Sequence, residues 1–241
     1  MKTLKLFVML AISAVMLCVA TSCGSSEGTE DNNEEQEHVG VYVINGHRFV
    51  DLGLPSGLLW AETNVGAKTA ADDGCYFAWG ETDMTTKASY DWKTYSHGSS
   101  PDNLTGYNTV DGKNTLAKSN DAACVNWGES CRMPTKEEFD ELLNTSYCTW
   151  TWTDTTTSDG SSVAGYKVTS TKNGNSIFLP ASGYRYEKDL LKRSSYGRYW
   201  SSSLNTGESG YAYALRFLDD QYYLGYRYRF YGHPVRPVAE H

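Results

Sequence analysis

Short runs of apolar and β-branched residues, separated by turns rich in glycine and asparagine, constrain the fold of this 241-residue chain more than any other feature. Asn45-Gly46 separates two such runs, 41–44 and 48–52, and an Asn-Gly pair at this kind of junction predicts a tight β-hairpin. A second hairpin is predicted around the turn 172–175. Further short strands are expected toward the C-terminus. Strands joined by tight turns pair antiparallel, so the chain should form mainly antiparallel sheet.

One segment has the signature of a helix. Thr135 and Glu138 form a capping-box pair at its start, directly after Pro134. Three apolar side chains then share one face at helical spacing: Phe139, Leu142 and Leu143. A shorter helix is expected near 121–123. A single strong helix between strands predicts an α+β fold, with a mostly antiparallel sheet and one or two helices.

The first 38 residues predict an export signal and a linker. A basic start, an apolar stretch over 6–20 and small residues before Cys23 resemble the signal peptide of a bacterial lipoprotein. The resemblance implies that residues 1–22 are removed, that Cys23 is lipidated, and that the protein is anchored in outer-membrane lipid at the cell surface. In the alternative, ordinary signal cleavage leaves Cys23 without a role. Residues 23–38 contain six carboxylates and no Lys or Arg, which predicts a disordered acidic tether before a single domain over 39–241.

Export to an oxidising compartment makes the four remaining cysteines candidates for disulfides. Three pairings of Cys75, Cys124, Cys131 and Cys148 are open, and the thiols could also simply be buried. Of these we favour a Cys124–Cys131 disulfide, whose cysteines flank the short segment 125–128. No Cys-x-x-Cys pair occurs and the five histidines lack zinc-ligand spacing, so no metal site is predicted.

The sequence lacks the common catalytic and nucleic-acid-binding signatures. It has no Gly-x-Ser-x-Gly nucleophile motif, no Walker loop and no dinucleotide-binding glycine motif. The candidate acid/base carboxylates are Glu81, Asp83, Glu137 and Glu141. A net charge of −8 disfavours general nucleic-acid binding, which needs an excess of Lys and Arg. The sequence therefore predicts a protein that is not an enzyme, uses no cofactor and binds no nucleic acid.

An ordered series of short motifs covers about residues 48–238. The motifs are VDLGLPSGLLW (50–60), NVGA (64–67), FAWGET (77–82), RMPT (132–135), LPASGYR (179–185), YWSSS (199–203) and VRPV (235–238). Together they resemble the Fibrobacter succinogenes major paralogous domain, a family of Bacteroidetes surface lipoproteins. The resemblance implies a C-type lectin-like fold, which formylglycine-generating enzymes share. Those enzymes need late cysteines, whereas the last one here is Cys148, and calcium-lectin signatures such as Glu-Pro-Asn are missing. Neither oxidase chemistry nor calcium-dependent sugar binding is expected.

The tyrosines are concentrated near the C-terminus, where residues 184–231 contain 11 of the 18. In a strand, Tyr226, Tyr228 and Phe230 would share one face, while Arg227, Arg229 and Tyr231 would share the other. Tyr and Arg dominate binding hot spots, so this segment is the predicted contact surface for a protein or glycan ligand. The predicted ligand-binding residues are Arg198, Tyr211, Arg216, Tyr222, Tyr223, Tyr226, Arg227, Tyr228 and His233. Four neighbours are assigned to the core instead: Trp200, Leu215, Phe217 and Val235.

The same segment resembles the variable region of proteins diversified by bacterial retroelements, in which adenine mutagenesis turns Asn codons into codons for residues such as Tyr, Arg, Gly and His. Several residues over 216–233 fit this origin, whereas Glu208 and Gln221 do not. Ordinary family drift explains the segment equally well. The expected function is a surface-anchored adhesin-like or receptor-like binding module. The alternatives are an enzyme of the same fold acting on surface polysaccharide or peptide, and a structural fimbrial component.

Overall fold

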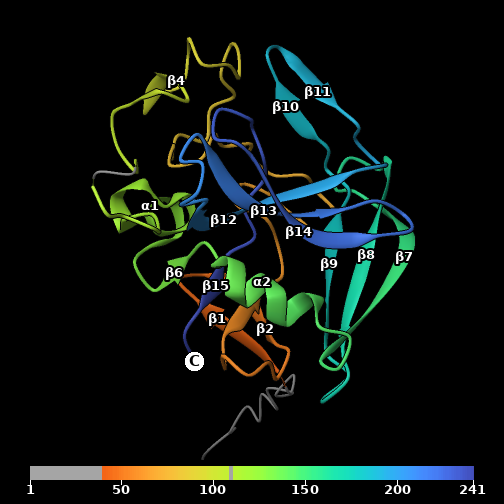
Figure 1. Ribbon diagram of the computed structural model, residues 1–241. Coiled ribbons are helices and arrows are strands. Elements are labelled where there is room, and N and C mark those ends of the chain that lie inside the picture. Colours follow the sequence, from red (N-terminus) through yellow and green to blue (C-terminus); the bar gives the residue numbers. More distant parts are fainter. Residues whose placement is uncertain (1–39, 109–110) are drawn as a thin grey trace, which may run out of the picture. The chain divides into compact units, whose positions relative to one another are not determined.

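The two hairpins that the Asn-Gly turns predict are present in the computed structural model, which describes residues 40–108 and 111–241 (Figure 1). β1 (Val41–Ile44) and β2 (His47–Asp51) pair antiparallel through Asn45 and Gly46, whose φ angles are 50° and 79°. Asparagine and glycine adopt such positive angles at low cost. β8 (Ser162–Ser170) and β9 (Ser176–Pro180) form the second hairpin. The predicted signal peptide, the lipidation of Cys23 and the acidic tether lie outside the described residues.

A five-stranded sheet joins the first and last strands of the described chain. Its order is β1-β2-β3-β15-β6, completed by β3 (Leu59–Ala61), β6 (Cys131–Arg132) and β15 (Val238–Ala239). β15 lies between β3 and β6, with Val238 opposite Trp60 on one side and opposite Arg132 on the other. This long-range pairing closes the domain.

Two three-stranded sheets carry most of the remaining strand residues. One has the order β7-β8-β9, with β7 spanning Cys148–Thr156. The other consists of β12 (Gly197–Leu204), β13 (Tyr211–Phe217) and β14 (Tyr222–Tyr228), with β14 at its edge. Two hairpins stand apart, formed by β10 (Tyr184–Tyr186) with β11 (Asp189–Leu191) and by β4 (Gly98–Ser100) with β5 (Asn103–Leu104). Every strand pair in the described residues is antiparallel, which confirms the α+β class and the mostly antiparallel sheet.

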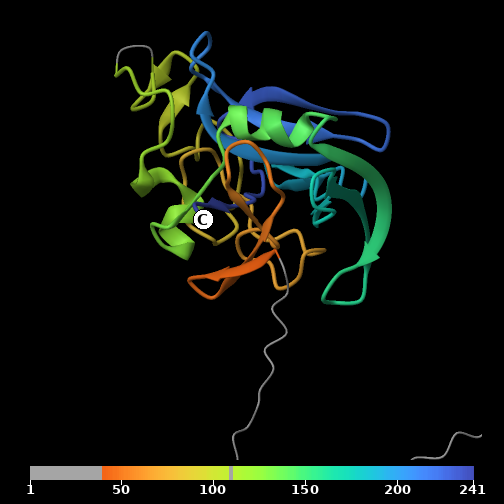
Figure 2. The ribbon, with the colours of Figure 1, turned by 90° about the horizontal axis from the view of Figure 1, so that it is seen from below.

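The two α-helices in the described part of the chain are α1 (Ala122–Trp127) and α2 (Lys136–Leu143). α2 begins with the predicted capping box: the Thr135 hydroxyl accepts from the Glu138 backbone N–H, and the Glu138 carboxylate accepts from the Thr135 N–H. The helix packs against β12, β13 and β14, and Figure 2 shows it lying across these strands. Neither helix is long and apolar enough to cross a membrane.

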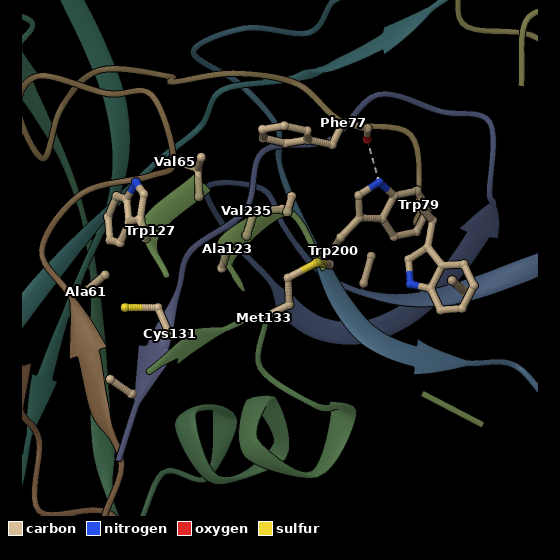
Figure 3. Close-up of a cluster of buried hydrophobic side chains, with 14 of the residues drawn as sticks. Ala61, Val65, Phe77, Trp79, Ala123, Trp127, Cys131, Met133, Trp200 and Val235 are labelled. Carbon is tan, nitrogen blue, oxygen red and sulfur yellow. Dashed lines mark hydrogen bonds between the residues drawn. The ribbon is translucent and has the colours of Figure 1, made fainter. Parts of the chain in front are cut away.

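The main hydrophobic cluster lies between the five-stranded sheet, α1 and one side of β12–β14 (Figure 3). Trp200 lies in it with no exposed surface, and its indole N–H donates to the Phe77 carbonyl oxygen at 2.8 Å. Leu215, Phe217 and Val235 are also fully buried, which confirms all four core assignments.

The predicted Cys124–Cys131 disulfide is not formed. All four cysteines in the described residues are free, and the Cys124 thiol donates to the backbone carbonyl oxygen of Cys131 at 2.8 Å. This contact directs the Cys124 sulfur toward the backbone of Cys131. Burial raises the pKa of Cys124 to about 11 and raises that of Cys131, so both thiols stay protonated near neutral pH.

Candidate functional site

The predicted binding residues lie on both sides of the β12-β13-β14 sheet. On one side, Leu215 and Phe217 pack into a core cluster with the β7–β9 sheet and α2, and Tyr222 and Leu224 pack against that cluster. On the other side, Arg198 is opposite Arg216, and Arg216 is opposite Tyr223. Figure 1 shows α2 and the β10–β11 hairpin on opposite sides of these strands. Within β14 the expected alternation is present, with Tyr226 and Tyr228 on one side and Arg227 on the other, so the predicted binding residues divide between two surfaces.

Three arginines and four tyrosines form a cluster on the side away from α2. Its members, which we call the Arg–Tyr cluster, are Arg198, Arg216, Arg227, Tyr184, Tyr196, Tyr223 and Tyr231. The Arg198 guanidinium carbon lies 3.4 Å from the Tyr184 ring centroid and 5.1 Å from that of Tyr196. Arg216 lies 4.9 Å from the Tyr223 ring centroid and donates to the Tyr196 hydroxyl at 3.0 Å. Cation–π contacts of this kind hold the guanidinium groups against the rings.

The positive charge of the Arg–Tyr cluster has no carboxylate counterpart among the residues that the structure describes. Within residues 40–108 and 111–241, none of its three arginines forms an ion pair. Arg198 and Arg216 are only 7% and 9% exposed, yet the Nε atom of each is buried without a hydrogen-bond acceptor. Burial, followed by the charge of Arg227, lowers the pKa of Arg198 to about 10. Arg198 and Arg216 are thus buried at an electrostatic cost that tyrosines relieve in part and no described carboxylate relieves.

One tyrosine of the cluster responds to this charge. Burial raises the pKa of Tyr196, but the charges of Arg216 and Arg198 and hydrogen bonds from Tyr223 and Arg216 outweigh that effect. The pKa of Tyr196 therefore lies below the ordinary tyrosine value. A group that becomes an anion is stabilised at this position, which is the behaviour expected of an anion-binding environment.

Gly225 provides the space in which Arg216 lies. A Cβ atom at this position would lie 3.0 Å from Arg216 Cδ and 3.4 Å from its Nη1 atom. The Arg216 side chain therefore crosses the neighbouring strand directly over a residue without a side chain. Gly225 is one of the residues over 216–233 that fit a diversified origin, and the sequence does not indicate its contact with Arg216. The predicted binding residues also leave out Tyr184, Tyr196 and Tyr231, although all three belong to the tyrosine-rich segment.

Four more tyrosines lie on the same side as α2, near the edge strand. This tyrosine row comprises Tyr211, Tyr213, Tyr226 and Tyr228. Tyr211 stacks on Tyr228 with ring centroids 4.1 Å apart, and Tyr226, at 44% exposure, contacts Tyr211 edge-on. Ring contacts continue from Tyr228 through Phe230 to Tyr231, at 5.5 Å and 4.8 Å. An unbroken series of aromatic contacts therefore connects the tyrosine row with the Arg–Tyr cluster.

His233 and Tyr222 have less surface available than the sequence suggests. His233 has no exposed surface and stacks on Trp200, with ring centroids 4.0 Å apart. Burial, reinforced by Arg198, Arg227 and Arg216, holds its pKa well below the ordinary histidine value. His233 therefore presents no surface to a ligand, because its ring is part of the core. Tyr222 is half-buried and stacks on Trp150 at 4.6 Å.

Arg229 differs from the alternation that the sequence predicts. β14 ends at Tyr228, so Arg229 does not continue the face that carries Arg227. Its side chain is fully buried and donates to the Tyr95 hydroxyl and to the carbonyl oxygens of Gly106, Tyr107 and Ser209. Arg229 is therefore a structural residue whose position depends on the chain turning inward after the strand.

The candidate acid/base carboxylates are each engaged locally. Glu81 lies beside a cavity of about 440 Å³, but its two oxygens accept from Lys87 Nζ at 2.8 Å and 2.7 Å. Asp83 also lines this cavity, and a hydrogen bond from the Thr85 backbone lowers its pKa. Glu137 pairs with Lys136, and Glu141 accepts from the Ser56 N–H. In the described residues, no three His, Cys, Asp or Glu side chains form a metal-binding group.

Three comparisons with known proteins found no match. Neither a protein-family model, nor a curated protein, nor a solved structure matches this chain. The resemblance to a known family therefore rests on the sequence motifs.

Proposed function

We propose that this protein is a surface-anchored binding module without enzymatic activity, which holds a protein or glycan ligand on its Tyr/Arg-rich C-terminal surface. The observation that carries the proposal is the unbroken series of aromatic contacts from Tyr226 to Tyr231, next to arginines that form no ion pair in the described chain. Tyrosine offers a large rigid contact area and a hydroxyl at low entropic cost, and tyrosine and arginine are enriched in binding hot spots.

The proposal includes the fold family and the anchor. We assign residues 39–241 to a C-type lectin-like domain of the Fibrobacter succinogenes major paralogous type, on the motifs given above. Removal of residues 1–22 and lipidation of Cys23 would attach it to the outer membrane, and the acidic segment up to residue 38 would act as a tether. Membrane attachment that persists in Cys23→Ala would contradict the lipid anchor.

The diversification proposal concerns the C-terminal strands. The β14 residues that fit such an origin lie on both sides of the strand, with Tyr223, Gly225 and Arg227 on one side and Tyr222, Tyr226 and Tyr228 on the other, so diversified codons would change both surfaces. The DNA test is direct. A nearby near-copy of this gene segment with adenines at those codons supports diversification, and its absence contradicts it.

A binding screen on glycan and protein arrays tests the proposed function. Tyr226→Ala removes a tyrosine that is 44% exposed in the tyrosine row, whereas Tyr147→Ala removes one that is 37% exposed outside it. We expect Tyr226→Ala to weaken binding about tenfold and Tyr147→Ala to leave it unchanged. The triple variant Tyr223→Ala, Tyr226→Ala, Tyr228→Ala should abolish it. Unchanged affinity in the triple variant would overturn the proposal, and assembly of the protein with rising concentration would instead favour a structural role.

A further inference from the structure

We propose that the Arg–Tyr cluster binds the carboxylate or sulfate group of an acidic sugar. This inference rests on the proposed function and narrows its ligand to one chemical class. The observation behind it is that arginine N–H groups of the cluster have no acceptor in the described chain. No described residue accepts a hydrogen bond from Arg198, and Arg216 donates only to the Tyr196 hydroxyl.

The cost of burying these arginines implies a missing partner. Arg198 and Arg216 face each other in register on neighbouring strands, and Arg227 lies close enough to influence both electrostatically. Three like charges repel one another, and burial removes the water that would otherwise screen them. An oxyanion placed among the guanidinium groups would neutralise this repulsion and accept paired hydrogen bonds from the planar forks.

The arrangement of the arginines suits an oxyanion. Arg216 is held over Gly225 between Tyr196 and Tyr223, and Arg198 is held against Tyr184. The guanidinium groups are therefore positioned before any ligand arrives, which lowers the entropy lost on binding. Arg227 is less buried, and only its Nη1 donates, to the Tyr226 carbonyl oxygen at 2.6 Å.

The surroundings favour a sugar over an acidic peptide. The other members of the cluster are tyrosines, which combine a flat apolar ring with a hydroxyl. A sugar ring has the same combination of an apolar C–H face and hydroxyl groups. An acidic peptide would offer its carboxylates on flexible side chains, whereas an acidic sugar offers a carboxylate or sulfate on a rigid ring and loses less entropy on binding. The ligand therefore combines a ring with a carboxylate or sulfate substituent.

The test uses ligands that differ only in charge. Tetragalacturonate and its fully methyl-esterified form have the same sugar chain, and a sulfated tetrasaccharide with its desulfated form provides a second pair. Calorimetric titration of the unmodified protein should show at least one acidic probe binding about tenfold or more tightly than its neutral partner, since charge-assisted hydrogen bonds are lost in the neutral form. Failure of both acidic probes, or equal binding within both pairs, would overturn the inference. Equal binding of tetra-aspartate would overturn the assignment to a sugar.

Arginine variants locate the site. Arg216→Gln and Arg198→Gln should each weaken binding of the acidic probe about tenfold or more and leave the affinity for its neutral form unchanged. Arg48→Gln is the matched control, since Arg48 pairs with Glu62 and its side chain is 53% exposed. Acidic binding that survives both cluster variants would overturn the inference. If a neutral array ligand depends on Tyr226 while the acidic probes fail, the acidic-sugar inference is wrong and the proposed function stands.

Discussion

Two pairs of buried arginines in this protein have opposite environments. Arg236 has no exposed surface and donates to Asn64 Oδ1 and to the carbonyl oxygens of Ala61, Glu62 and Phe178, at 2.7–3.0 Å. Arg229 is equally buried and has four acceptors of its own. Arg198 and Arg216 are almost as buried, but tyrosine rings surround them and most of their donors have no acceptor in the described chain.

The comparison shows that burial alone does not assign a role to an arginine. Burial lowers the pKa of both Arg236 and Arg198 to about 10, so the pKa does not distinguish them. The number of hydrogen bonds that each guanidinium donates distinguishes Arg236 from Arg198. A buried guanidinium that satisfies several backbone carbonyls holds separate segments together, whereas one with unused donors has capacity for a ligand.

The largest expected effect is on stability. Arg236→Met leaves three backbone carbonyls and Asn64 without their donor, and should lower the free energy of unfolding by about 4 kcal/mol or more. Arg198→Met removes a buried guanidinium whose N–H groups have no acceptor in the described chain, and it should change the free energy of unfolding by no more than about 1 kcal/mol. Urea denaturation of the two variants measures the difference. Equal losses would show that the two environments are energetically the same.

The next effect concerns acid stability. The unfolded chain protonates His233 near the ordinary histidine pKa, whereas the folded chain holds that pKa well below it, by burial and by the nearby arginines. The contribution of neutral His233 to the free energy of unfolding is complete above the ordinary histidine pKa. Between that pKa and the lower pKa of the folded chain, the contribution falls by about 1.4 kcal/mol for each unit by which the pH decreases. His233→Phe should keep the stacking on Trp200 and reduce this loss between pH 7 and pH 5. Identical pH profiles for the two proteins would refute this assignment.

A smaller effect is expected at Gly225. Gly225→Ala should shift Arg216 by a few tenths of an ångström, because the new Cβ would lie 3.0 Å from Arg216 Cδ. We expect tetragalacturonate to bind several-fold more weakly, while stability changes by less than about 1 kcal/mol. Gly207→Ala is the control, since its Cβ would meet no atom closer than 3.5 Å. The same affinity for both variants would show that Arg216 does not need this space.

The smallest effect is spectroscopic. Tyr196 should ionise at a lower pH than an ordinary tyrosine, because Arg216 and Arg198 stabilise its phenolate. In an ultraviolet titration, Tyr196→Phe should remove the transition at the lowest pH, and Arg216→Gln should move it upward. A titration that neither variant alters would contradict the electrostatic description of the cluster.

Local signals in the sequence predicted a large part of the fold. The Asn45-Gly46 hairpin, the Thr135–Glu138 capping box and the antiparallel character depend on residues close together in the chain, and all three are present. The candidate site was predicted in part. The tyrosine-rich segment includes the whole Arg–Tyr cluster, but His233 lies in the core and the Cys124–Cys131 bridge is not formed. Those errors concern contacts between segments, about which local patterns carry no information.

The buried arginines separate what the sequence determines from what only the tertiary structure determines. Composition and alternation alone establish that this chain concentrates tyrosine and arginine on short antiparallel strands near its C-terminus. They do not distinguish Arg198 and Arg216 from Arg229 and Arg236, because the residues next to an arginine in the chain do not determine which distant acceptors it will meet. The distinction depends on which distant carbonyl groups reach each guanidinium. For Arg236 these come from residues 61, 62 and 178, and for Arg229 from residues 106, 107 and 209. Only the folded chain brings those groups together, since a hydrogen bond requires atoms about 3 Å apart whatever their separation in sequence.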